Sequence, residues 1–411
     1  MPTPPILEIY VVWHPDDLLG TTVSESLIEH FHGPAYAGLA GGAVEVYLRS
    51  AGWGDRAGPP RPLPFMTPLP ADLPAGQITV VIPILGRALA RAVRKSKEWR
   101  EYFEAIFDAD AASALPDRQI VAVYPLSIPE ADLSGSQLAG LAARPQALPR
   151  AAAASSTVLA REVAQAITQR IAREFVDAHL EERITVFISH TKHAGASSDE
   201  PAHLVGLVRE VLRATHLDGF FDAQDIQVAD DWEHILDTHA ARHALLMLRT
   251  DMYASREWTQ REVLAAKVHD IPIVSMYAVR NEEHRGSFLM DHVPVVACLP
   301  EDERGAIERG LNRLVDEALK RALWITQRVY LERDFDWLPV HAPEPVTLAA
   351  WLRSNRRATQ DPNLLIMHPD PPLGPKERAV ILEFCELAGL TGQLDILTPR
   401  TFATRGGTSQ P

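Results

Sequence analysis

Short apolar runs that alternate with amphipathic helical segments are the feature that most constrains how this chain folds. In the second half, the apolar runs are ITVFIS (184–189), GFFD (219–222), ALLMLR (244–249) and IPIVSMYAV (271–279). Helical periodicity is expected between them, over about 201–215, 231–243 and 255–270. Strands that are apolar throughout and joined by helices predict a parallel sheet covered on both faces. Right-handed crossovers then make this half a flavodoxin-like doubly wound α/β domain.

The first half shows the same alternation. Its apolar runs cover 6–13, 43–50, 78–85 and 119–128, and its helical segments cover 21–32 and 96–109. The end of the chain adds one more unit, with apolar runs at 363–369 and 393–399 on either side of a helical segment at 374–389. The sequence therefore predicts a second α/β domain of similar architecture and a smaller C-terminal piece.

Domain boundaries are expected where composition changes. The stretch from Leu141 to Ser156 is low in complexity and leads into a long segment of helical periodicity. The predicted order is an α/β domain, a linker helix, a second α/β domain, a C-terminal helical and α/β extension, and a disordered tail, over 1–150, 151–183, 184–300, 301–402 and 403–411.

Composition excludes several classes of protein. Hydrophobic residues make up 46% and charged residues 23% of the chain, as in an ordinary globular domain. The formal net charge is -14 and the basic residues form no long run, which argues against a nucleic-acid ligand. No apolar stretch reaches the roughly 18 residues of a membrane span, and the N-terminus lacks the basic region of a signal peptide.

The two cysteines, Cys298 and Cys385, lie far apart in apolar settings. They neither build a disulfide framework nor match the spacing of metal ligands. The reducing cytoplasm is therefore the expected location, and no metal site is expected.

One motif occurs twice: WHPDDLLG (13–20) and MHPDPPLG (367–374) both follow an apolar run. It could form a repeated ligand loop through His14, Asp16, His368 and Asp370. The alternative is a strand-to-helix turn in which Pro, Asp and Gly set the geometry. The turn is favoured, because a short match of turn residues arises often.

Four segments of the second half resemble, in order, the strands and loops of a TIR (Toll/interleukin-1 receptor) domain. They are ITVFISHT, GFFDAQDIQVADDW, ALLMLRTDMYASREWTQREV and IPIVSMYAV, and together they extend over about 120 residues. Two positions depart from the family pattern. Ala229 stands where the BB loop usually has a glycine, and Thr259 stands where a cysteine often follows the tryptophan.

The resemblance implies an enzyme that cleaves the nicotinamide–ribose bond of NAD+ and gives nicotinamide and ADP-ribose or a cyclic variant. The family's catalytic glutamate corresponds to Glu262, four residues after Trp258 and therefore on the same helical face. NAD+ is the substrate, and no cofactor or metal is implied. The alternative for Glu262 is a solvated carboxylate that pairs with Arg261 or Lys267, and for Trp258 it is a core anchor of its helix.

A pocket formed by the first-strand loop, the BB loop and the helix of Glu262 is expected to bind the substrate. The resemblance implies substrate contacts by Phe187, Ser189, His190, Lys192, Asp225, Trp232, Ser255 and Trp258. Lys192 would supply positive charge for the phosphates, and Ser189 and His190 would meet the ribose or the phosphates. For His190 and Lys192, an ordinary polar loop is an equally good interpretation.

The first half looks like a degenerate copy of the TIR domain. Its segment SKEWREYFEAIF has Phe103 four residues after Trp99, and its carboxylates fall at Glu101 and Glu104. We therefore expect this copy to lack the catalytic glutamate and to serve sensing or assembly.

The resemblance also implies partners and a role. Bacterial TIR proteins commonly act in antiphage immunity and signal transduction, with activity gated by oligomerisation through TIR–TIR contacts and by an activating partner or small-molecule signal. Two other functions stay open: a non-catalytic TIR adaptor that acts by protein–protein contacts, and an enzyme like the nucleoside deoxyribosyltransferases, which also use a glutamate.

Overall fold

The structure is a computed structural model. The chain forms two compact units. The first unit comprises Met1–Arg170 with Ala403–Thr408, and the second comprises Ile171–Phe402 with Ser409–Pro411. The residues that the structure describes are 6–36, 43–50, 52, 58–67, 76–111, 120–128, 131–150, 152, 155–175, 184–191, 200–215, 217–222, 243–283, 285–331, 344–354, 363–390 and 393–405.

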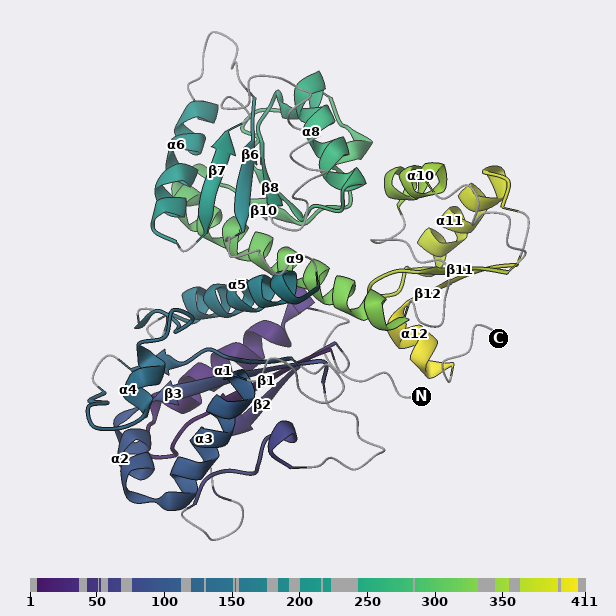
Figure 1. Ribbon diagram of the computed structural model, residues 1–411. Helices are drawn as coiled ribbons and strands as arrows, with labels where there is room; N and C mark the ends of the chain where they lie inside the picture. Colours follow the sequence, from purple (N-terminus) through teal and green to yellow (C-terminus); the bar gives the residue numbers. More distant parts are fainter. Residues whose placement is uncertain are drawn as a thin grey trace. The chain divides into compact units, whose positions relative to one another are not determined.

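The first unit is built on a parallel sheet with the strand order β2-β1-β3-β4 (Figure 1). Its strands are β1 (Leu7–Val12), β2 (Val44–Arg49), β3 (Ile78–Leu85), β4 (Ile120–Val123) and β5 (Leu126–Ser127), the last also paired with β3. Every residue of β1 and β3 is buried, as expected of strands covered on both faces. The single strand predicted at 119–128 is divided into β4 and β5 around Pro125, because proline has no N–H for the ladder.

The helices of the first unit are α1 (Leu19–Phe31), α2 (Arg87–Lys95), α3 (Lys97–Ala111) and α4 (Leu138–Ala142), and α5 (Ser156–Phe175) crosses the boundary between the units. Sequence analysis predicted α1 and α3 but missed α2. This helix has only nine residues, and it turns its apolar side chains Leu89, Ala90 and Val93 into the core. Its side chains do follow helical spacing, but the span is shorter than the roughly 11–18 residues over which periodicity is usually assessed.

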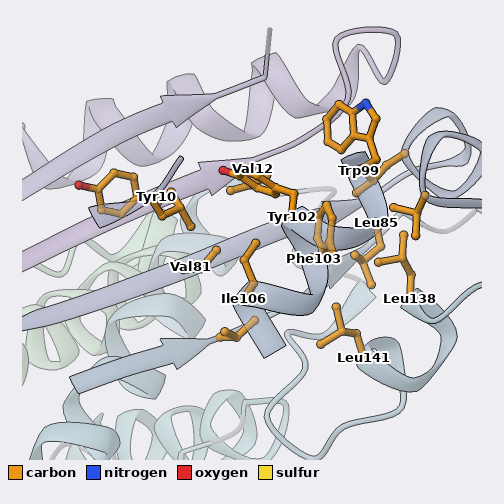
Figure 2. Close-up of a cluster of buried hydrophobic side chains, with 14 of the residues drawn as sticks. Tyr10, Val12, Val81, Leu85, Trp99, Tyr102, Phe103, Ile106, Leu138 and Leu141 are labelled. Atoms are coloured by element: carbon orange, nitrogen blue, oxygen red, sulfur yellow. The ribbon is translucent and has the colours of Figure 1, made fainter. Parts of the chain in front are cut away.

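The core of the first unit lies between the sheet and α3 (Figure 2). Trp99, Phe103 and Ile106 of α3 are buried beside Val12 and Val81 of the sheet, and Leu138 and Leu141 of α4 join the cluster. The Trp99 and Phe103 rings stack with centroids 6.4 Å apart. Trp99 and Phe103, one helical turn apart, therefore serve packing in this unit.

The first His-Pro-Asp segment forms a turn that ties β1 to the helix after β3. His14 Nδ1 accepts a hydrogen bond from Asp16 N at 3.2 Å, and the Asp17 carboxylate accepts from Ala88 N at 3.0 Å and Leu89 N at 2.9 Å. Asp17 thereby caps the N-terminus of α2, where free N–H groups and the helix dipole favour a carboxylate.

We expect Asp17→Ala to lower the free energy of unfolding of the first unit by about 1 kcal/mol, the usual cost of losing an N-cap. Urea denaturation of the full chain would measure it. Asp17→Asn, which can still accept one of the two hydrogen bonds, should recover about half of the loss. An unchanged midpoint in Asp17→Ala would contradict the capping role.

The second His-Pro-Asp segment also forms a turn. His368 is buried, its Nδ1 lies 2.9 Å from the Pro369 carbonyl oxygen, and burial lowers the pKa of its ring. Asp370 accepts a hydrogen bond from Arg400 N at 3.4 Å, at the start of the helix after the neighbouring strand. Both segments direct a carboxylate to the backbone of a following helix, although from different positions of the motif, Asp17 in the first and Asp370 in the second, and both are turns.

The second unit carries a parallel sheet with the strand order β10-β9-β8-β6-β7 (Figure 1). Its strands are β6 (Thr185–Ser189), β7 (Asp218–Asp222), β8 (His243–Arg249), β9 (Ile273–Tyr277) and β10 (Val295–Ala297). Counted from β6, this is the order 2-1-3-4-5 of flavodoxin-like folds. The predicted fold class is confirmed: both units are α/β with parallel sheets.

Three helices of this unit are α6 (Glu200–Arg213), α8 (Glu257–Val268) and α9 (Glu303–Leu331). Helix α9, which sequence analysis placed in the 301–402 extension, lies against β8 and β9. Its Gly310 favours this approach, because a Cβ there would lie 2.5 Å from the Met276 sulfur and the methionine side chain would have to move. The predicted helix at 231–243 lies outside the described residues.

The C-terminal part of this unit contains the two-stranded parallel pair β11 (Asn363–Met367) and β12 (Gln393–Leu397). Its helices are α10 (Pro345–Ser354) and α11 (Pro375–Leu387), and α12 (Pro399–Thr404) crosses the boundary between the units. None of the helices in the described ranges combines the length and the hydropathy that a membrane crossing requires.

Candidate active site

Glu262 lies on α8 with only 3% of its surface exposed. The helix start that positions it is held by side chains: Thr259 Oγ1 donates to the carbonyl oxygens of Tyr253 at 2.6 Å and Arg256 at 2.9 Å, and Gln260 Nε2 donates to that of Ala254 at 2.8 Å. These bonds satisfy carbonyl groups of the turn before the helix. Thr259, which is buried, thus has a packing and hydrogen-bonding role here.

A chain of hydrogen bonds holds the Glu262 carboxylate. Ser189, the last residue of β6, donates its hydroxyl proton to Glu262 Oε2, and the Ser189 oxygen also bonds the Tyr253 hydroxyl. With the serine proton directed to the carboxylate, the tyrosine must be the donor in the second bond. All three side chains are buried.

The Tyr253 phenol stays protonated in this environment. Burial raises its pKa well above the ordinary value, and the nearby Glu262 charge raises it further, against a smaller opposite effect of the Ser189 hydrogen bond. A raised pKa keeps the phenol protonated at neutral pH, which agrees with its role as the donor to Ser189. The arrangement polarises both hydroxyl groups toward the carboxylate.

The site lies where a parallel sheet favours ligands. Ser189 ends β6, and the turn with Tyr253 follows the end of the neighbouring strand β8, so both mark the carboxyl edge. The same edge is braced by a bidentate ion pair between Arg249 and Glu283, with both N–O distances 2.7 Å. Asp251 adds a hydrogen bond from Arg280 N at 2.7 Å, which ties the loops after β8 and β9 together.

The other predicted site residues divide into those that the structure describes and those that lie outside the described residues. His190 is buried next to Ser189, with Nδ1 donating to the Thr191 carbonyl at 3.1 Å, and Trp258 is half-buried on α8. Ser255 donates to the Met252 carbonyl at 2.8 Å and serves the turn. Phe187 lies in the hydrophobic core with Leu245.

Lys192, Asp225 and Trp232, together with Ala229 of the BB loop, lie outside the described residues. In the part of the chain that the structure describes, no group of three His, Cys, Asp or Glu side chains is arranged to hold a metal ion.

The alternative for Glu262 as a solvated helical carboxylate does not agree with its burial. Sequence analysis missed Tyr253 as a site residue, although its position nine residues before Glu262 lay in the quoted motif. No local pattern in the sequence revealed Tyr253, because its hydrogen bond is with Ser189, which lies 64 residues earlier on β6.

In the described part of the first unit, the helix α3 carries an apolar residue where α8 has Glu262. On α3, Phe103 occupies the place four residues after Trp99 and is fully buried in the apolar cluster. A carboxylate there would have no polar partner among these apolar neighbours.

We expect Ser189→Ala to reduce the rate of any reaction that uses Glu262. The variant removes a hydrogen bond to a buried charged group, worth about 1.5–3 kcal/mol, or roughly 10- to 100-fold in rate if the bond holds the carboxylate in its reactive position. Tyr253→Phe removes only the outer bond and should cost less. Steady-state kinetics of both variants would test this order, and the reverse order would contradict it.

Comparisons with known proteins add little. No protein-family model and no curated protein matches the chain. Among solved structures, it matches a Clostridium novyi NT protein described as a "putative tagatose-6-phosphate ketose/aldose isomerase", with 10% identity over 76% of this chain and 78% of that one. The TM-score of 0.20 is too low for this similarity to bear on fold or function.

Proposed function

We propose that this protein is an NAD+ hydrolase that cleaves the nicotinamide–ribose bond, with Glu262 as the catalytic residue. The observation that carries the proposal is a buried carboxylate, hydrogen-bonded by Ser189, at the carboxyl edge of a parallel sheet. The TIR-like order of motifs around Glu262 and its spacing from Trp258 supply the choice of substrate.

The chemistry needs one well-placed negative charge. In NAD+ the nicotinamide ring is cationic, so the C1′–N bond breaks with its electron pair going to nitrogen, and neutral nicotinamide leaves without a general acid. The ribose then carries positive charge, as in the oxocarbenium-like transition state of glycoside hydrolysis. Water adds to C1′ and loses a proton to give ADP-ribose; attack by the adenine ring instead gives a cyclic product.

Glu262 suits this step because a carboxylate in a site shielded from water stabilises developing positive charge more strongly than one in bulk solvent. Ser189 and Tyr253 would hold its orientation before the substrate arrives, which is the condition for electrostatic catalysis. Trp258 and His190, near Glu262 and Ser189 in the chain, would line the approach to C1′.

The burial of Glu262 fits an activity that is low until the protein assembles. With 3% of its surface exposed, the residue offers little area to a substrate, so the site must open before NAD+ reaches it. We infer that self-association through the TIR-like unit, or an activating partner or small-molecule signal, favours the open state. Such a gate suits a cytoplasmic immune effector that acts against phage by depleting NAD+.

The test is nicotinamide release from NAD+ by the purified full chain at several protein concentrations. Turnover that rises faster than linearly with concentration is expected for a site completed by assembly. Parallel reactions with deoxynucleosides test the deoxyribosyltransferase alternative, and base release from these instead of NAD+ would refute the proposal.

A further inference from the structure

A basic surface on the first unit has no role in the proposed function. Helix α2 and the first turn of α3 carry six exposed cations: Arg87, Arg91, Arg94, Lys95, Lys97 and Arg100. Lys97 pairs with Glu101 at 3.3 Å, and the other five have no ion-pair partner among the described residues. This is a concentration of unpaired positive charge on a chain with a formal net charge of -14.

Sequence analysis found no long basic run, because Arg87, Arg91 and Arg94 are separated by apolar residues and the short Arg94–Lys97 cluster is followed by an acid. Once α2 forms, side chains three and four residues apart become neighbours on one face. Arg87, Arg91 and Arg94 follow this spacing. The helix thus creates a charged face that is not a run in the sequence.

A pocket of about 210 Å³ opens at this surface. It is lined by Val93, Arg94, Arg100, Gly135, Ser136 and Gln137. Val93 and Arg94 lie at the end of α2, Arg100 lies on α3, and Gly135, Ser136 and Gln137 directly precede α4. Gly135 has φ +68° and no atom within 4 Å of a Cβ built on it, so the wall there is open backbone.

Both guanidinium groups are anchored and still have free donors. Arg94 Nη1 donates to the Ser134 carbonyl at 2.9 Å, and Arg100 Nη2 donates to the Arg94 carbonyl at 3.4 Å. Gln137 Nε2 donates to the Arg100 carbonyl at 3.3 Å and joins the loop to α3. Each guanidinium has five N–H donors in a planar fork that matches phosphate oxygens, so each keeps several for a ligand.

Acidic side chains also occur at this surface: Glu98, Glu101 and Glu104 lie on α3, and Asp132 lies in the turn beside Arg94. Asp132 accepts from Ser134 N at 3.0 Å and Ser134 Oγ at 2.6 Å, and these bonds are the main reason that its pKa is lowered, with smaller effects of Arg94 and Arg87. Its charge is thus used to shape the turn that holds Arg94. The cations of α2 remain in excess.

From this geometry we propose that the pocket binds the phosphate group of a small phosphomonoester, such as a sugar phosphate. Its volume corresponds to about seven waters at roughly 30 Å³ each. That is enough for a phosphate and part of the group that carries it, and less than the roughly 300 Å³ at which drug-sized sites begin. Two arginine forks on one side supply the charge and the directional donors. The inference does not depend on NAD+ hydrolysis.

Isothermal titration calorimetry with ribose 5-phosphate tests the proposal on the full chain. Saturable binding is expected for the native protein and no binding for ribose, which lacks the phosphate. Arg94→Gln/Arg100→Gln should weaken binding at least tenfold. The matched control is Arg304→Gln/Arg309→Gln, which changes the net charge equally at two exposed arginines of α9 and should leave binding unchanged.

Three results would overturn the proposal: no saturable heat with ribose 5-phosphate, equal binding by the Arg94/Arg100 double variant, or equal weakening in the Arg304/Arg309 control. Titration with a single-stranded oligonucleotide distinguishes a surface that binds polyanions from a pocket that binds a single phosphate group. Binding of the oligonucleotide without binding of ribose 5-phosphate would assign the surface to nucleic acid instead. Thermal unfolding of each variant verifies that the loss is not a folding defect.

Discussion

Glu262→Gln is expected to lower nicotinamide release from NAD+ by at least about 10²- to 10³-fold, the usual cost of removing one group that stabilises a transition-state charge. Glutamine keeps the size of the side chain, and its carbonyl oxygen can still accept from Ser189. What it lacks is the negative charge that would face the ribose as the C1′–N bond breaks. The loss should appear in kcat, since the charge acts in the transition state more than in binding NAD+.

The matched control is Glu257→Gln on the same helix. Glu257 has 85% of its side chain exposed and pairs with Arg261 at 3.6 Å, so it carries the same charge without the burial. Its loss should leave nicotinamide release within about twofold, because exposed pairs contribute little. Activity that survives in Glu262→Gln would place the catalytic residue elsewhere.

The melting temperature of Glu262→Gln distinguishes a catalytic role of Glu262 from a structural one. A buried carboxylate is costly to desolvate, so replacing it with an uncharged amide should keep the melting temperature or raise it. If Glu262→Gln instead lowers both the melting temperature and the activity, and Ser189→Ala does the same, the carboxylate serves the fold. Loss of activity at an unchanged melting temperature is the expected result.

Trp99→Ala is expected to lower the free energy of unfolding of the first unit by about 3–5 kcal/mol, the cost of removing a large aromatic side chain from a packed core. Trp99 is 2% exposed, and its ring contacts His14, Tyr102 and Phe103, with centroids 5.5, 6.4 and 6.4 Å away. Its removal leaves a cavity between α3 and the sheet that these rings cannot fill (Figure 2).

Urea denaturation followed by far-UV circular dichroism would measure the change, and a decrease in the midpoint should accompany it. Trp99→Phe is the control: Trp99 Nε1 is buried with no hydrogen-bond partner in the described part of the chain, so phenylalanine loses volume but no polar contact. Trp99→Phe should lower the free energy of unfolding by less than half as much as Trp99→Ala does. A loss under about 1 kcal/mol in Trp99→Ala would show that the core closes around the gap.

The sequence was sufficient for most strands and helices of both sheets, although the three-residue strand β10 was missed. The segment 78–85 was predicted as a strand and is one with those bounds, and the helix predicted at 96–109 spans Lys97–Ala111. These elements carry their signal locally, since uninterrupted apolar runs and helical periodicity depend only on neighbours in the chain. The position of Glu262, four residues after Trp258, was likewise visible without a structure.

Only the tertiary structure decided what Glu262 contacts. A glutamate on an amphipathic helix is solvated by default, and its burial under Ser189 and Tyr253 arises because β6 and the turn after β8 meet at one sheet edge. The charged face of α2 likewise exists only once the helix forms. The face of α2 needs only its own helix, whereas the contacts of Glu262 join residues far apart in the chain and therefore leave no local pattern in the sequence.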